Sequence, residues 1–204
     1  MEHNLTPSDI MSMDEYGVIR KNRAKALAAS KKNRRVEVGP SCTFYFENFD
    51  TMWFQIHEML FIEKGGKEQI PGELAAYNPL IPKGKELVAT VMIEVGDPGR
   101  RAILLSKLGG FEETISLFIN EEKVNALPET DIDRITSEGK ASSVQFVRFP
   151  FNEKQIAAFC SKSPQILLTV GHPEYHHMAG IPKNVHEALI GDFDYDKGPT
   201  PPKR

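Results

Sequence analysis

The chain has 204 residues, 40% of them hydrophobic and 26% charged, with a net charge of −3 and a pI of about 6.1. This composition predicts one folded domain with a sizeable core, and the pI argues against a dedicated DNA-binding protein. Cys42 and Cys160 form no CxxC pair, which argues against a disulfide framework or a cysteine-based zinc site. The polar N-terminus and the lack of an apolar run of ~18 residues predict a cytoplasmic protein without a membrane span.

The first part of the chain is predicted to be mainly helical. Ser12 and Glu15 form a capping box that begins a long helix, and Gly39 and Pro40 interrupt an alternating segment as a turn or bulge. In chain order, the expected elements are a short helix from residue 6, a helix over 12–33, a strand or hairpin arm over 36–48, helices over 50–64 and 68–77, and an extended, rigid connector over 77–82.

The second part is predicted to contain most of the strands. Its expected elements, in order, are a strand over 87–95, a helix over 100–108, strands over 114–120 and 123–128, a polar loop over 130–141, a strand over 142–151, a helix over 152–162, a last strand over 165–173 and a last helix over 184–193. Strict βαβ alternation is missing, so we expect a single α+β domain over 1–193, with a largely antiparallel sheet and N-terminal and interspersed helices. The polar, proline-rich segment 194–204 is predicted to be a disordered tail.

The helix over 50–64 is predicted to be apolar nearly all round and therefore buried. Its main stripe is Met52, Trp53, Ile56, Met59 and Leu60, its second stripe is Phe54 and Phe61, and Gln55 and Glu58 lie on the flank of the main stripe. Glu63 falls within the main stripe, where a carboxylate has to be paired, hydrogen-bonded, protonated or metal-bound. We predict a polar cluster with Glu63 buried against Arg20 or Arg23, and acid–base or metal chemistry is the alternative. His57 is predicted to be exposed or interfacial.

A basic segment lies between residues 20 and 35. It contains no acidic residue and eight cations, which are Arg20, Lys21, Arg23, Lys25, Lys31, Lys32, Arg34 and Arg35. Since the whole chain has a net charge of −3, the rest of the chain carries −11 (−3 − 8). This asymmetry favours either an acidic protein partner, bound through Lys31, Lys32, Arg34 and Arg35, or an ordinary solvated helix end, and both rank above weak nucleic-acid binding.

Three histidines, His172, His176 and His177, follow the predicted last strand. Pro173 and Gly180 bracket them, so the segment is predicted to be a solvated polar loop, and the histidines are only weak candidates for a metal site. The sequence also contains no GxxxxGK[ST], GxGxxG, GxSxG or HExxH motif. We therefore expect no cofactor, with a transition metal as the alternative.

Four blocks of the sequence carry a resemblance to a known family. They are EYGVIRKNR (Glu15–Arg23), FENFDTMWFQIHEML (Phe46–Leu60), ELAAYNPLIP (Glu73–Pro82) and SSVQFVRF (Ser142–Phe149). In combination they resemble the bacterial domain of unknown function 3501 family over nearly the whole chain. The resemblance implies a cytoplasmic protein of a kind often encoded beside rubrerythrin-like and cysteine-rich iron–sulfur proteins. That association points to redox, iron or peroxide physiology.

The resemblance also singles out particular residues. Gln55, Glu58, Met59 and Glu63 match the QxxEMxxxE pattern of the family, whereas Trp53, His57 and Phe61 depart from it, and Tyr77 and Asn78 match again. The departures supply the second apolar stripe, so Trp53 and Phe61 are predicted to mark a partner surface. By analogy, Tyr77 and Asn78 are expected to shape a cleft beside the helix.

These observations favour a non-catalytic accessory or interaction protein in cytoplasmic redox, iron or peroxide physiology. The expected partner is an acidic protein of the rubrerythrin-like or iron–sulfur kind, and self-association is left open. One alternative is a metal-dependent enzyme that uses Glu58, Glu63 and the C-terminal histidines. The other is a weak nucleic-acid binder that uses the basic segment.

Overall fold

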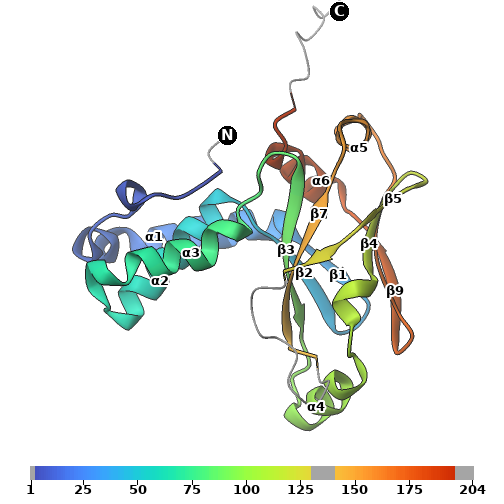
Figure 1. Cartoon of the computed structure of the whole chain (residues 1–204), viewed down its shortest axis with the longest axis horizontal. Helices are drawn as coiled ribbons and strands as arrows, with labels where there is room; N and C mark the ends of the chain where they lie inside the picture. Colours follow the sequence, from blue (N-terminus) through green and yellow to red (C-terminus); the bar gives the residue numbers. More distant parts are fainter. Residues whose placement is uncertain (1–2, 130–140, 196–204) are drawn as a thin grey trace, which may run out of the picture.

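A computed structural model describes residues 3–129 and 141–195 of the chain and shows an α+β fold. A layer of three helices projects from one side of a body built from two antiparallel sheets (Figure 1). The helices of this layer are α1 (Met13–Lys31), α2 (Phe49–Glu63) and α3 (Ile70–Tyr77), and those of the body are α4 (Pro98–Lys107), α5 (Glu153–Phe159) and α6 (Lys183–Leu189). In the described parts of the chain, no helix is long and apolar enough to cross a bilayer.

The strands form two antiparallel sheets, whereas the sequence predicts one. The first has the order β1-β2-β3-β7-β6 and the second β5-β4-β8-β9, with every pairing antiparallel. The strands are β1 (Arg35–Val38), β2 (Cys42–Phe46), β3 (Glu86–Ile93), β4 (Ile115–Ile119), β5 (Glu122–Asn125), β6 (Leu127–Pro128), β7 (Val144–Pro150), β8 (Ile166–His172) and β9 (Tyr175–Gly180).

Strand β3 contributes buried side chains to both hydrophobic cores. Its side chains alternate between the two faces of the first sheet, so Leu87 and Ala89 pack into the larger core between the sheets, whereas Val88 packs into a smaller core beneath the helices. Because both faces are covered, nearly the whole strand is buried, which explains its continuous apolar sequence.

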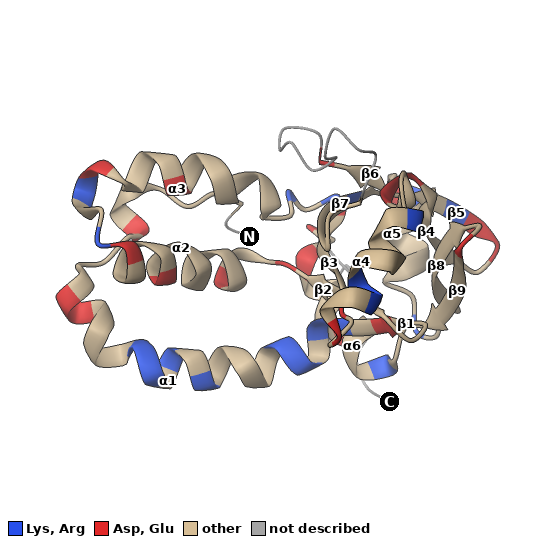
Figure 2. Cartoon of the chain, turned by 90° about the horizontal axis from the view of Figure 1, so that it is seen from below, with Lys and Arg blue, Asp and Glu red and all other residues tan. Residues whose placement is uncertain are grey.

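The smaller core lies between the helical layer and the first sheet. Met52, Ile56 and Leu60 of α2 fill it, together with Leu74 of α3 and Leu5 of the N-terminal segment. These three α2 residues belong to the predicted main stripe and are buried as expected, whereas the other two, Trp53 and Met59, are partly exposed. In Figure 2, α2 lies between α1 and α3, so the helix with the most buried side chains of the layer occupies its centre.

A buried ion pair joins the 3-10 turn before β1 (Lys32–Arg34) to the 3-10 turn after α6 (Ile190–Asp192). Arg34 pairs with Asp192, and its guanidinium also donates to the backbone carbonyls of Phe46 at 2.9 Å and Glu47 at 3.0 Å. The side chains of Arg34 and Asp192 are each only 5% exposed. The prediction that Arg34 binds a partner protein is therefore wrong, because its guanidinium is buried and paired with Asp192.

Several expected boundaries also change. The predicted extended connector is in part a 3-10 turn (Asn78–Leu80), and the segment predicted to be a polar loop after β8 forms β9. Asp194, assigned to the tail, accepts a hydrogen bond from His3 and donates its backbone N–H to Gly84. Residues 130–140 of the predicted polar loop and 196–204 of the predicted tail lie outside the described residues.

Candidate functional site

The polar cluster between α1 and α2 is centred on Glu58. The buried Tyr16 donates its hydroxyl to Glu58 Oε1 at 2.6 Å, and Arg20 donates to both carboxylate oxygens, Nε to Oε1 at 2.7 Å and Nη2 to Oε2 at 2.6 Å. The hydrogen bonds from Arg20 lower the pKa of the Glu58 carboxyl, although burial acts to raise it. Burial raises the pKa of the Tyr16 phenol. The arrangement therefore holds an ionised carboxylate between two helices.

Glu63 does not join this cluster. It is exposed and accepts a hydrogen bond from Gln69 Nε2 at 2.6 Å, so the prediction that it is buried against Arg20 or Arg23 is wrong. Glu63 is the last residue of α2, and Arg20 pairs one turn earlier with Glu58. Gln55, the other flanking residue, instead reaches toward α3 and lies 3.5 Å from the Tyr77 hydroxyl.

His57 was predicted to be exposed or interfacial, and this prediction is also wrong, because the side chain is completely buried. Its Nδ1 lies 2.7 Å from the backbone carbonyl of Trp53, four residues earlier, and its Nε2 accepts the backbone N–H of Met11 at 3.2 Å. These two contacts define a neutral ring with the proton on Nδ1. Burial lowers the pKa of His57, in agreement with this assignment.

The aromatic residues that depart from the family pattern pack against α1. The Arg20 guanidinium lies 4.8 Å above the ring of Phe61, and the Arg23 guanidinium lies 4.9 Å above Trp53. Trp53 also donates its indole N–H to the backbone carbonyl of Asp9 at 3.0 Å. Both rings are half-buried, their contacts join α1 to α2, and the partner surface expected at these two rings stays a prediction.

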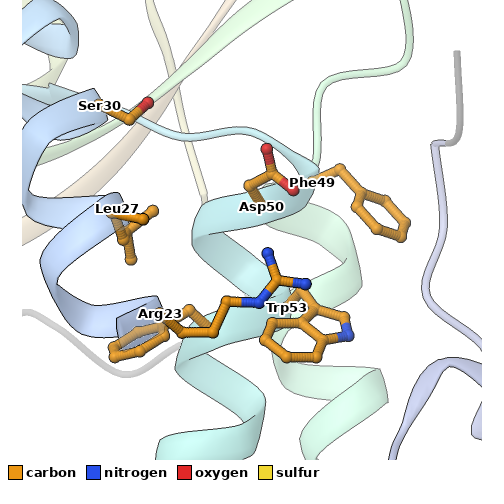
Figure 3. Close-up of a pocket in the computed structure, with 8 residues that line it drawn as sticks. Arg23, Leu27, Ser30, Phe49, Asp50 and Trp53 are labelled. Atoms are coloured by element: carbon orange, nitrogen blue, oxygen red, sulfur yellow. The ribbon is translucent and has the colours of Figure 1, made fainter. Parts of the chain in front are cut away.

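A pocket of about 220 Å³ opens between α1 and α2 beside this stacked arginine (Figure 3). It is lined by Arg23, Ala26, Leu27, Ser30, Phe49, Asp50, Trp53 and Phe54. Except for Arg23 and Trp53, none of these was a predicted site residue. The two helices are brought together by tertiary packing, so sequence periodicity gives no direct signal for the pocket.

The remaining cations of the basic segment stay at the surface. Lys21, Arg23, Lys25, Lys31 and Lys32 make no ion pair within residues 3–129 and 141–195, whereas Arg35 pairs with Glu37 on β1. Lys21 and Lys25 of α1, and Lys32 of the 3-10 turn that continues it (Lys32–Arg34), are exposed and recur at helical spacing on the side that faces away from α2. We call these three lysines, together with Val18, the α1 outer face.

The other predicted site residues lie elsewhere. Asn78 bonds both backbone polar groups of Leu5, accepting its N–H at 2.7 Å and donating to its carbonyl at 2.9 Å, so it anchors the N-terminal segment. Asn78 also lines a shallow surface hollow beside α3, and Tyr77 is not among the residues that line it.

The three C-terminal histidines belong to the β8–β9 hairpin, on the side of the body away from α2 (Figure 1). His172 is buried and lies 3.2 Å from the carbonyl of Gly109, whereas His176 and His177 are neighbours on a strand and point to opposite faces. The structure therefore does not bring them together with Glu58 or Glu63. Among the residues placed in the structure, no three His, Cys, Asp or Glu side chains form a metal-binding group.

The fold and site define a two-sheet α+β protein with a helical layer that carries an aromatic–arginine cluster and a basic outer face. The chain belongs to the family described as Protein of unknown function (DUF3501), whose model matches residues 4–193. It is similar to a protein of unknown function from Burkholderia pseudomallei K96243, with 33% identity. That crystal structure superposes with a TM-score of 0.87 over 94% of this chain and 100% of the other. No curated protein matches the chain.

Proposed function

We propose that the protein is a non-catalytic accessory protein in cytoplasmic redox, iron or peroxide physiology that binds an acidic protein partner through the α1 outer face. One observation carries the proposal: of the 19 residues of α1, only Tyr16 is buried, and the outward side presents lysines that no described residue neutralises. Val18, which is 82% exposed, adds an apolar contact at one end of this face. Such a surface attracts an acidic partner and offers it a place to bury an apolar side chain.

The same charges support a protein partner over a nucleic acid. The α1 outer face contains three lysines, and because binding to duplex DNA grows with the number of phosphates that Lys and Arg neutralise, three cations supply only weak binding. The charge of −11 outside the basic segment, obtained as −3 − 8, would also repel a polyanion of extended shape. The family resemblance implies rubrerythrin-like and iron–sulfur proteins as the partner class to test first.

The test uses the variant Lys21→Glu/Lys25→Glu/Lys32→Glu and a rubrerythrin-like protein from the same organism. We expect association with the variant to be at least ~10-fold slower at low salt, and its salt dependence to disappear, because the steering charge is reversed. The rate is measured by surface plasmon resonance over a range of NaCl concentrations.

The matched control is Lys67→Glu/Lys123→Glu/Lys162→Glu, which makes the same change of net charge at exposed positions outside α1. If both variants slow association equally, the effect comes from net charge and the proposed surface is wrong. If the α1 variant loses binding to duplex DNA while it keeps the protein partner, weak nucleic-acid binding replaces the proposal.

A further inference from the structure

We propose that the pocket between α1 and α2 binds a small zwitterion with an apolar side chain, of which a free α-amino acid such as leucine is the simplest example. The inference does not depend on the proposed partner, because the pocket lies on the side of α1 that faces α2. Its volume of about 220 Å³ is below the roughly 300–1,000 Å³ of sites for drug-sized ligands, which suits a ligand of amino-acid size.

The walls of the pocket supply an apolar surface. Leu27 of α1 and Phe49, Trp53 and Phe54 of α2 all line it, and Figure 3 shows Leu27 on the α1 side and Trp53 on the α2 side, with the ring of Phe49 turned away from Leu27. Removing an aliphatic side chain from water against such walls is favourable at roughly 25 cal/mol per Å² of apolar area. The apolar part of the ligand is assigned to this surface.

Two opposite charges stand at the same opening. The guanidinium of Arg23 is held over the Trp53 ring, and Figure 3 shows it directed toward the side of the pocket where the Asp50 carboxylate lies. Neither group makes a hydrogen bond or ion pair, with the other or with any side chain in the described ranges. Both charges therefore remain available to a ligand, and Ser30 also lines the pocket.

This pair of charges selects the ligand class. An anion would be attracted by Arg23 but repelled by Asp50. A cation would be attracted by Asp50 but repelled by Arg23. A neutral apolar molecule would remove water from both charges without replacing their hydrogen bonds, which is unfavourable. A zwitterion places its carboxylate on Arg23 and its ammonium group on Asp50, and so satisfies both.

The experiment uses the intrinsic fluorescence of Trp53, because it is the single tryptophan of the chain and forms part of the pocket wall. The full-length protein is titrated with L-leucine, with L-leucine amide, which lacks the carboxylate, with N-acetyl-L-leucine, which lacks the ammonium group, and with glycine. Calorimetry of the same titrations checks the signal. We expect saturable binding of leucine and binding at least ~10-fold weaker for the three analogues, because each lacks one element of recognition.

Two variants assign the charges. Arg23→Gln should lower the affinity for leucine at least ~10-fold but leave the affinity for leucine amide unchanged, because the amide has no carboxylate to pair with Arg23. Asp50→Asn should lower the affinity for leucine by a similar factor but leave the affinity for N-acetyl-L-leucine unchanged, because that analogue has no ammonium group to pair with Asp50. Lys25→Gln, on the outer face of α1, is the matched control and should bind leucine like the wild type. Melting curves show whether each variant is folded.

Two outcomes would overturn the inference. The first is the absence of saturable leucine binding below roughly 10 mM, the concentration at which even an inefficient ligand of this size binds. The second is equal binding of leucine and its blocked analogues, which would leave only an apolar contact. If the wild-type protein binds no leucine and the Arg23→Gln variant no longer binds the acidic partner, the pocket is instead part of the partner surface.

Discussion

At the scale of single residues, His57 shows how a polar side chain becomes part of the packing. Its ring lies 3.8 Å from that of Trp53 and 5.0 Å from that of Tyr16, and its two nitrogens bridge the backbones of α2 and the N-terminal segment. Protonation would place a charge on Nε2, which accepts the N–H of Met11, and so remove that hydrogen bond. His57 is therefore structural, and its neutral form is the one that fits.

This leads to a prediction for the pH dependence of stability. Burial lowers the pKa of His57 in the folded state below the 6.5 of an unfolded histidine. The unfolded chain therefore binds the proton first, so the free energy of unfolding should fall as the pH decreases below 6.5, by at most ~1.4 kcal/mol per pH unit for one proton. In His57→Gln, which cannot titrate, this part of the slope should be absent. Urea unfolding between pH 7.5 and 5 measures the difference, and equal slopes would contradict the prediction.

At the scale of secondary-structure elements, Arg34 and Asp192 connect parts of the chain that lie far apart in sequence. Removing one partner of a buried ion pair leaves the other charge unpaired, which costs about 3–5 kcal/mol. We therefore predict that Asp192→Ala lowers the free energy of unfolding by about that amount. The exposed pair of Arg35 and Glu37 is the control, because Glu37→Ala should cost less than about 1 kcal/mol. Urea denaturation measures both, and comparable losses would refute the assignment.

Element types could largely be predicted from the sequence, because they depend on local signals. The Ser12–Glu15 capping box is present at the start of α1, and Asn48 caps α2 next to the predicted start. Strand β9 was missed because its histidines suggested a loop, although Pro173 and Glu174 form a two-residue turn between His172 and Tyr175.

The candidate site was predicted only in part. Helical periodicity placed Glu63 on the apolar stripe, but α2 ends at this residue and its side chain is exposed, whereas the flanking Glu58 meets Arg20 on α1. Which residue of one helix faces which residue of another depends on the packing register of the two helices. A single sequence does not contain that register, and for the same reason Asp50 and Leu27 could not be assigned to one pocket.

At the scale of the whole molecule, the helical layer and the two-sheet body have separate cores that meet at β3. Leu5 belongs to the smaller core, is 2% exposed and is held by Asn78. It lies far from the strands of the second sheet, whose apolar side chains fill the larger core. A cavity at Leu5 should therefore weaken one part of the molecule more than the other.

We predict that Leu5→Ala lowers the free energy of unfolding by about 2–5 kcal/mol and accelerates amide hydrogen exchange chiefly in α2 and α3. Exchange in β4 and β8 should change little under native conditions, because the contacts of these strands lie in the larger core. Leu117→Ala, at a fully buried position of β4, is the control and should accelerate exchange first in β4 and β8. Hydrogen exchange resolved by residue distinguishes the patterns. If Leu5→Ala accelerates exchange equally in α2 and β8, the two cores unfold as one cooperative unit, and the helical layer has no independent stability.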